Sequence, residues 1–435
     1  MADWIGETFT SETGWDHLER LVDLAPRMAG SAGERRAAEA TRDALDGVGA
    51  RDARLDEFEI QGWTRGESSV RAAGEPVAPD ALALPRSPSG EATGRLVDVG
   101  HGLPEDFDRD LSGAVVMAAS DVPDWYDRFL HRREKYYRAV EAGADAFLFR
   151  NHVEGRLAPT GSVGTDEAPV GTVPAVGVSA EDGARLARRH AGEEVTVAVE
   201  AETGRATSQN VHAELGPETE AAVLLTSHVD AHDIATGALD NGAGTATVVE
   251  VTRALAARED DLESRVHVVC FGAEEVGLVG SSHDAAARGP GSVRAVLNCD
   301  GVVGARTLRL HTHGFDGLER AAERVRERFD HPVETTPELM PHSDHWPYVA
   351  RGVPGYHATS ATGDAGRGWG HTRADTLDKL ESRTLREQAV LLTELAVALA
   401  SADASVDDRD PDAIAEQAER EGLAAGMRVT GDWPF

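Results

Sequence analysis

Residues able to do chemistry gather at the ends of short apolar runs in this sequence. The first stretch is residues 224–240, LLTSHVDAHDIATGALD, where an apolar run leads into a glycine-punctuated loop carrying His228, Asp230, His232, Asp233 and Asp240. Later runs end in acidic residues, and a last histidine follows them: Glu274 and Glu275 in VCFGAEEVG, Asp300 in VLNCDG, and His371 in GWGHTRADTL. Imidazole and carboxylate groups are ligands of catalytic zinc, which keeps one position open for water.

This set of groups is sufficient for a hydrolase with two metal ions. Two ions ~3.5–4 Å apart need a shared carboxylate, and a separate carboxylate must accept the proton of the attacking water. Adjacent side chains on extended backbone point in opposite directions, so one glutamate of the Glu274–Glu275 pair could bind metal while the other faces the water. An HxD tripeptide or a Glu-Glu pair alone is usually ordinary polar sequence. Only the ordered set favours a metal site.

Residues 211–401 alternate between strand-like and helical patterns, which is typical of an α/β domain around a largely parallel sheet. Apolar runs predict strands at 223–227, 266–272, 293–300, 307–313 and 353–359, and helices are predicted near 242–258, 281–288, 315–329 and 382–401. Ligands of such sheets bind outside the carboxyl ends of the strands. His228, Glu274 and Asp300 each follow a predicted strand, so the fold would place them at one edge.

The rest of the chain is divided by polar connectors. Residues 12–48 predict two helices, the second with Ser31 as a possible cap, and an extended pair follows at 55–60 and 63–72. The proline-rich stretch 74–91 indicates a boundary. After it come predicted strands at 96–100, 114–120, 146–150 and 195–200, with helices at 125–142 and 180–190. The expected segments are 1–74, 75–205, 206–402 and an acidic tail, 403–435, with a helical stretch near 412–424 that either packs on the surface or stays mobile.

The charge balance bounds the class of protein. The 435 residues include 43 basic and 76 acidic ones, a formal net charge of −33, and only Lys135 and Lys379 are lysine. Such a surface repels itself in dilute buffer, and the repulsion fades in ~1 M salt, where the Debye length is ~3 Å. A salt-loving source fits this charge, although arginine-biased coding alone would explain the scarcity of lysine. Nucleic acid is not expected as a partner because phosphate binding needs a basic face.

Targeting signals and cysteines add little. No apolar run approaches the ~20 residues of a membrane span, and the acidic start MADWIGETFTSE lacks the pattern of a signal peptide. A cytoplasmic protein without a membrane partner is expected. Cys270 and Cys299 lie inside apolar runs and are predicted to be buried core residues, and two cysteines are too few for a disulfide framework.

Five motifs occur in order: HVD with ATGALDNGAGT, FGAEEVGLVGS, NCDG, SDHWPYVARGVPG and GHTRADTL. Together they resemble the co-catalytic zinc aminopeptidases, the M28 family of metallopeptidases, over residues 10–70 and 205–401. The resemblance implies a zinc-exopeptidase-like domain with a central, mostly parallel mixed sheet, built from 1–74 and 206–402. It also implies a cofactor of two Zn²⁺ ions, or other divalent metals.

The resemblance assigns the metal ligands by position: His228 and Asp300 on one zinc, Glu275 and His371 on the other, and Asp240 bridging the two. Glu274 would be the general base. Asp230 would orient the His228 ring, a support that metal-bound histidines commonly require. Because all six ligand and base positions are present, a catalytically silent binding module and a one-zinc relative of the glutaminyl cyclase kind are less favoured alternatives.

The middle segment, 75–205, also matches a known pattern. RLVDVG, AVEAGADAFLFRN and TVPAVGVS resemble a protease-associated (PA) domain inserted into such peptidases. A generic small α/β insert is the alternative.

The chain departs from the family pattern before the SDH motif. Part of the family has a tyrosine there that polarises the scissile carbonyl, whereas this chain reads ELMPHSDH, with Met340 near that place. His342, His345 or Tyr356 could take over that role.

Other polar residues near the motifs are given supporting roles. His232 and Asp233 are expected to support the site or face solvent rather than bind metal. His311 and His313 are expected to be structural. Arg367 could meet a substrate carboxylate, or could be an exposed loop arginine. The predicted activity is that of a dizinc exopeptidase acting on peptides, with aminopeptidase as the leading form and carboxypeptidase or dipeptidase as the alternative.

Overall fold

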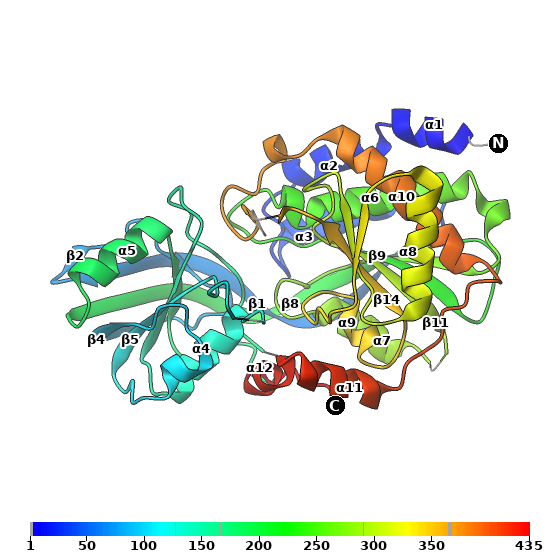
Figure 1. The fold of residues 1–435 in the computed structure, drawn as a ribbon. Helices are drawn as coiled ribbons and strands as arrows, with labels where there is room; N and C mark the ends of the chain where they lie inside the picture. The colour runs from blue at the N-terminus through cyan, green and yellow to red at the C-terminus, as the bar shows by residue number, and fades with distance from the viewer. Residues whose placement is uncertain (1–2, 127, 166, 290, 364–367) are drawn as a thin grey trace.

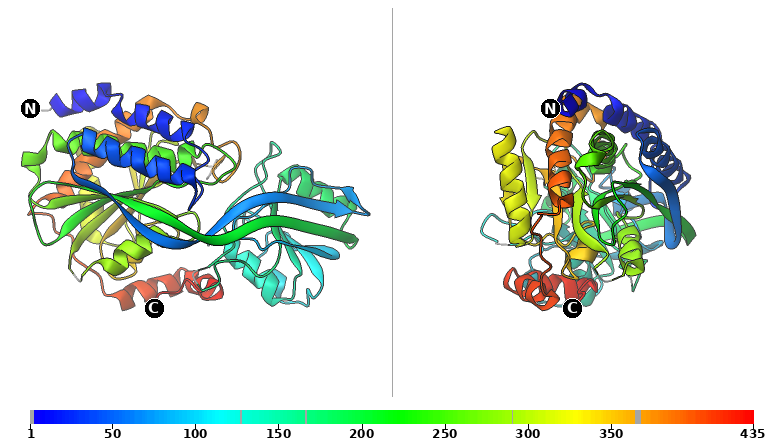
Figure 2. Two further views of the ribbon diagram at one scale, coloured as in Figure 1. Left: turned by 180° about the vertical axis from the view of Figure 1, so that it is seen from behind. Right: turned by 90° about the vertical axis from the view of Figure 1, so that its right-hand side faces the viewer.

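Two strands of 22 residues each connect the two halves of the molecule: β1 (Arg51–Ala72) and β8 (Glu194–Leu215). They pair antiparallel along most of their length, and Figure 2 shows them passing from one half into the other. The sequence predicted two extended runs where β1 is a single strand. The pairing continues through the expected gap because Gly62 stands opposite Gly204 within the ladder.

This computed structural model describes residues 3–126, 128–165, 167–289, 291–363 and 368–435. Within them one sheet of fourteen strands has the order β13-β12-β14-β11-β9-β10-β8-β4-β5-β6-β7-β3, and β1 and β2 (Glu75–Pro76) extend it from β8. The predicted α/β fold around a mostly parallel mixed sheet is confirmed.

The larger half holds the central parallel strands. These are β9 (Ala222–His228), β10 (Arg265–Phe271), β11 (Val293–Cys299) and β14 (Gly355–Ser360), followed by β12 (Leu308–His311), antiparallel to β14, and the edge strand β13 (Val333–Thr336). Val223 and Leu225 of β9 belong to one core, while Leu224 between them belongs to a second core on the opposite face. Burial on both faces explains the continuous apolar runs of these strands.

Helices cover both faces of this part of the sheet (Figure 1). On one side lie α2 (Thr13–Asp23), α3 (Ala32–Gly47), α6 (Ala243–Ala256) and α10 (Ser382–Ala400), with α8 (Asp316–Phe329) beside α10 and α1 (Asp3–Thr10) at the N-terminal end. On the other lie α7 (Val279–Ala287) and the short α9 (Trp346–Val349). Ser31 caps α3 as predicted, since its side chain accepts a hydrogen bond from the Glu34 N–H. Single helical turns occur at Glu259–Asp261 and Leu377–Lys379.

The smaller half is built on the far ends of β1 and β8. Its strands are β4 (Gly90–Asp98), β5 (Ala114–Ala119), β6 (Ala146–Arg150) and β7 (Ala175–Val178), all parallel, and the edge strand β3 (Leu82–Ala83). The helices are α4 (Arg132–Glu141), α5 (Ala180–Arg189) and the turn Pro104–Phe107. Helix α4 begins seven residues later than the predicted 125–142, because His131 caps it by accepting from the Arg133 N–H.

The acidic tail packs against both halves. It forms two helices, α11 (Pro411–Arg420) and α12 (Leu423–Thr430), separated by Gly422 in the left-handed region. Ile414 and Met427 join the large core, and Asp432 pairs with Arg133 of α4 at 2.8 Å. None of the described helices is long and apolar enough to cross a membrane. Cys270 and Cys299 are buried and free, as predicted.

Candidate metal centre

Three neighbouring parallel strands deliver the candidate ligands to one edge of the sheet. β9 lies between β10 and β11. His228 is the last residue of β9, the Glu274–Glu275 pair follows β10, and Asp300 follows β11. Because these strands are parallel, their carboxyl ends meet, as the sequence pattern predicted. Asp240 lies in the turn Ala238–Gly242 before α6.

The first donor group consists of His228, Asp240 and Asp300. His228 Nε2 lies 3.4 Å from an Asp240 oxygen and 3.6 Å from an Asp300 oxygen. His228 is 1 % exposed, and among the described residues its Nε2 has no hydrogen-bond partner. Burial alone would lower the pKa of His228, but Glu274 and the three carboxylates of Asp230, Asp240 and Asp300 hold it well above its ordinary value. Such a nitrogen among carboxylates suits a divalent cation.

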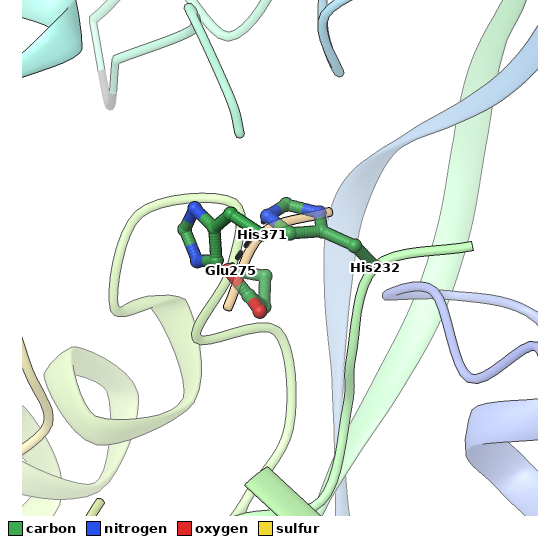
Figure 3. A group of neighbouring side chains, drawn as sticks. All are labelled: His232, Glu275 and His371. Carbon is green, nitrogen blue, oxygen red and sulfur yellow. Dashed lines mark ion pairs between the residues drawn. The ribbon is translucent and has the colours of Figure 1, made fainter. Parts of the chain in front are cut away.

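The second donor group consists of His232, Glu275 and His371 (Figure 3). His371 Nε2 is 3.2 Å from Glu275 Oε2 and 3.2 Å from Asp240 Oδ2. Asp240 therefore directs one oxygen toward each group, the arrangement that a bridging carboxylate requires. Burial alone would raise the pKa of Glu275, but His232 and His371 hold it well below its ordinary value.

His232 is buried and Asp233 is half-buried, so neither is a freely solvated residue, one of the two roles expected from the sequence. His232 is 5 % exposed, with Nε2 2.9 Å from Glu275 Oε2. Asp233 forms a two-pronged ion pair with Arg65 of β1, at 2.5 and 2.9 Å. In the loop that carries these two residues, Arg65 binds Asp233 and Glu275 lies against His232, so both side chains point toward the site.

Asp230 supports the site through several contacts. Its carboxylate accepts hydrogen bonds from the N–H groups of Glu274 and Glu275, at 3.0 and 3.2 Å. His228 Nδ1 lies 3.1 Å from the Asp230 carbonyl oxygen and 3.6 Å from its Oδ1. Asp230 is thus placed to orient the His228 ring and to fix the glutamate pair at the same time.

Glu274 faces the cavity and lies beside a second buried acid. Burial, followed by the nearby carboxylates of Asp344, Glu275 and Asp300, raises its pKa well above the ordinary value although His228 opposes the shift. Asp344, from the SDH motif, is itself fully buried, and burial raises its pKa to about 8. The sequence analysis had assigned Asp344 no role.

Two further residues that the sequence analysis missed hold the segment carrying Asp240. The carboxylate of Asp375 accepts from the N–H groups of Leu239 and Asp240, at 2.7 and 3.1 Å. Arg27 is 1 % exposed and donates to four backbone carbonyls, those of Leu21, Val229, Thr236 and Gly237. Asp375 stands four residues after His371, inside the GHTRADTL motif, and its place in that motif was a signal that could have identified it. Arg27 has no such local signal.

Replacing Arg27 by methionine is expected to lower the free energy of unfolding by about 3 kcal/mol or more, because carbonyls left without a donor cost ~1–3 kcal/mol each. The free energy of unfolding of Arg27→Lys should lie between those of the wild type and Arg27→Met. A compact ammonium group cannot reach all the carbonyls that the guanidinium reaches. Urea denaturation in high salt measures both, with Arg20→Met, at an exposed position of α2, the helix that precedes Arg27, as the control. Equal stability of the two methionine variants would contradict the role given to Arg27.

A cavity of about 390 Å³ opens onto both donor groups. Its walls come from both halves of the molecule and include Phe129, Arg132 and Ser162 of the smaller half and Leu239, Glu274 and Met340 of the larger half. The Thr160 N–H also donates to the His371 carbonyl at 2.8 Å. The smaller half therefore shapes the cavity and supports one of the candidate metal ligands.

The three candidates for the missing tyrosine differ in position. The Tyr356 hydroxyl donates to the Leu318 carbonyl inside the core, and His345 stacks between His313 and His357 with its Nε2 2.8 Å from the Met340 carbonyl. Neither of these two lines the cavity, whereas His342 does, stacked on His131 at a ring distance of 4.5 Å. His342 is therefore the one of the three that is placed for the role.

His311 and His313 were predicted to be structural, and Arg367 to meet a substrate carboxylate or to be an exposed loop arginine. His313 is buried, with Nδ1 2.7 Å from the Gly355 carbonyl, as expected of a structural residue. His311 lines the cavity in addition to ending β12. Arg367 lies outside the described residues.

Comparison with known proteins places this site in a family. Profiles described as "Peptidase family M28" and "PA domain" match residues 210–396 and 92–186. Aminopeptidase YwaD of Bacillus subtilis is 30% identical over 281 residues, 63% of this chain and 57% of the relative. Carboxypeptidase Q of Bos taurus is 26% identical over 282 residues, 62% of this chain and 60% of the relative. The chain thus aligns with little more than half the length of these curated relatives.

Among solved structures, an aminopeptidase from Aneurinibacillus sp. strain AM-1 superposes with a TM-score of 0.69 at 25% identity, covering 94% of this chain and 98% of that one. The likeness extends over both halves of the molecule. The two matched segments lie within the two halves described above, and the M28 segment contains both donor groups. Residues 210–396 therefore form a Peptidase M28 domain, and residues 92–186 form an inserted PA domain.

Proposed function

We propose that this chain is a two-zinc exopeptidase that removes residues from the N-terminus of peptides. The observation that carries the proposal is the pair of donor groups that share Asp240 beside Glu274, with one Asp240 oxygen 3.4 Å from His228 Nε2 and the other 3.2 Å from His371 Nε2. A shared carboxylate next to a separate basic one is what two-metal hydrolysis needs.

The donor set fits zinc. Imidazoles and carboxylates converge in a buried site, and buried carboxylates are costly unless they are paired with positive charge. Ions bound there would polarise the scissile carbonyl and make water more acidic. Names of relatives also support zinc, since a structurally similar protein of Bacillus subtilis is titled a zinc aminopeptidase.

The chain's own residues would manage the proton. Glu274 accepts the proton of the attacking water and returns it to the leaving amine. Burial and the neighbouring carboxylates raise the pKa of Glu274. The positive charge of bound metal ions would lower this pKa and so favour the ionised form of the base. Asp230 keeps the Glu274 backbone in place.

The cavity between the two halves is where a peptide would lie. Its wall combines aromatic and apolar side chains, such as Phe129, Leu239 and Met340, with the site carboxylates. A catalytically silent scaffold is not supported, because the structure brings the predicted ligands and base together. Carboxypeptidase activity remains the second candidate, because one curated relative carries that name.

A panel of short peptides separates the two exopeptidases. In buffer with molar salt, peptides with a free N-terminus should be hydrolysed, and the same peptides blocked by N-acetylation should not. Chelator-treated protein serves as the blank, and amidated C-termini serve as the mirror control. Cleavage of N-blocked peptides that stops when the C-terminus is amidated would establish a carboxypeptidase and contradict the aminopeptidase proposal.

A further inference from the structure

His232 occupies a place that its sequence context did not predict. It lies four residues beyond His228, in the segment 229–237 whose carbonyls Arg27 anchors. Its side chain is 5 % exposed, and its ring stands almost perpendicular to that of His371, at 85° with 4.5 Å between centroids. Figure 3 shows the two rings gathered with the Glu275 carboxylate, each residue arriving from a different segment.

The contact between His232 and Glu275 is close but is not an ordinary hydrogen bond. Nε2 and Oε2 are 2.9 Å apart, yet in the described part of the chain neither nitrogen of His232 has a hydrogen-bond partner. Glu275 Oε1 is likewise unpartnered among the described residues. Buried polar atoms without partners are costly. A nitrogen and a carboxylate oxygen that lie this close without forming a hydrogen bond are expected when both face the same metal ion.

The distances around this point suit a small cation. Each of His232, Glu275 and His371 offers one atom that could bind a metal ion, and these three atoms lie within 4.8 Å of one another. Two ligands of a tetrahedral zinc, each ~2.0–2.2 Å from the metal, are ~3.3–3.6 Å apart. The 3.2 Å between Glu275 and His371 approaches this range, and the 2.9 Å between His232 and Glu275 is shorter, so metal binding would move these two groups slightly apart. A space of about 10 Å³ adjoins the three residues and Asp240.

We infer that His232 is a ligand of the second metal ion, in addition to Glu275, His371 and the shared Asp240. The inference rests on the two-ion site proposed above. It makes the ions unequal, because the first group offers one imidazole and two carboxylates whereas the second offers two imidazoles and two carboxylates. Four protein donors are typical of a closed site and three of a catalytic one that admits water.

The inequality has chemical consequences. Imidazole-rich sites favour zinc, cobalt and nickel over manganese and magnesium, so the second site should hold its ion more selectively. The open position for water then falls to the first group, which has three protein donors.

The test uses metal titration of the full chain in high salt. Chelator-treated wild-type protein and the variants His232→Ala and His232→Gln are titrated with Co²⁺, and the visible absorption bands of bound Co²⁺ report number, affinity and geometry. Both variants should bind one ion as wild type does and the other at least ~10-fold more weakly, with altered bands for that ion. His283→Ala, at an exposed histidine that belongs to neither donor group, should bind both ions as wild type does. Two ions with wild-type affinity and bands in the His232 variants would overturn the inference.

X-ray absorption of the unmodified Zn²⁺-loaded protein keeps the inference testable if the variants do not fold. Three imidazoles shared by two ions support it, and two imidazoles shared by two ions overturn it. The same measurement separates it from the two-ion proposal. A single bound ion with two imidazoles would end the two-ion count yet support His232 as a ligand, and a single ion with one imidazole would overturn both.

Discussion

Replacing Glu274 by glutamine is expected to lower kcat by ~10²–10⁴-fold while the protein keeps its full metal content. Glutamine has nearly the same shape but cannot accept the proton of the attacking water. Glu274 belongs to neither donor group, and its backbone N–H is held by Asp230 at 3.0 Å, so the substitution should leave the ligands in place. KM should change little, because the lost interaction develops only as the proton moves.

Metal analysis and steady-state kinetics on the same preparation decide the outcome. Glu338→Gln, at an exposed position of the larger half, is the matched control and should match wild type in both measurements. Undiminished turnover in Glu274→Gln would remove Glu274 as the base. Loss of turnover together with loss of an ion would instead make Glu274 a ligand, and the roles of the two adjacent glutamates would have to be exchanged.

The strand-end positions of the site could be predicted because they depend on local pattern and on a general property of parallel sheets. His228, Glu274 and Asp300 each follow an apolar run, and the structure brings them together at the ends of β9, β10 and β11. The single strand β1 was predicted as two extended runs, 55–60 and 63–72. In the structure Gly62, between these runs, pairs with Gly204 inside one long two-stranded ladder.

The residues that hold the site in place could not be predicted, because their contacts join segments that are distant in the sequence. Arg27 reaches the Val229 and Gly237 carbonyls, more than 200 residues away, and a lone arginine after a helix carries no signal of this. Local sequence likewise did not show where the His232 side chain lies, so this residue was expected to support the site or face solvent. Its position follows from the folding of the 229–237 loop, which Arg27, Arg65 and Asp375 hold in place.

Replacing Asp240 by alanine is expected to abolish turnover and to change the binding of both ions. Two divalent ions ~4 Å apart repel each other by an amount on the order of 15 kcal/mol at an effective dielectric constant of 20, and a carboxylate between them offsets part of this repulsion. Without Asp240 the first group retains only His228 and Asp300, which should not hold its ion. The second group retains His232, Glu275 and His371 and should bind its ion at least ~10-fold more weakly.

Asp300→Ala is the variant that isolates the bridging role. Asp300 lies 3.6 Å from His228 Nε2 and belongs to the first group alone, so its loss should release the first ion and leave the second at nearly wild-type affinity. Both variants should therefore retain about one ion per chain when metal is abundant, and only Asp240→Ala should lose that ion under mild chelation. Because the two substitutions remove the same chemical group from the same pocket, a difference in the affinity of the remaining ion measures what Asp240 contributes to the second site. Equal affinities would show that Asp240 serves the first ion only, and retention of two ions by Asp240→Ala would contradict the bridged arrangement.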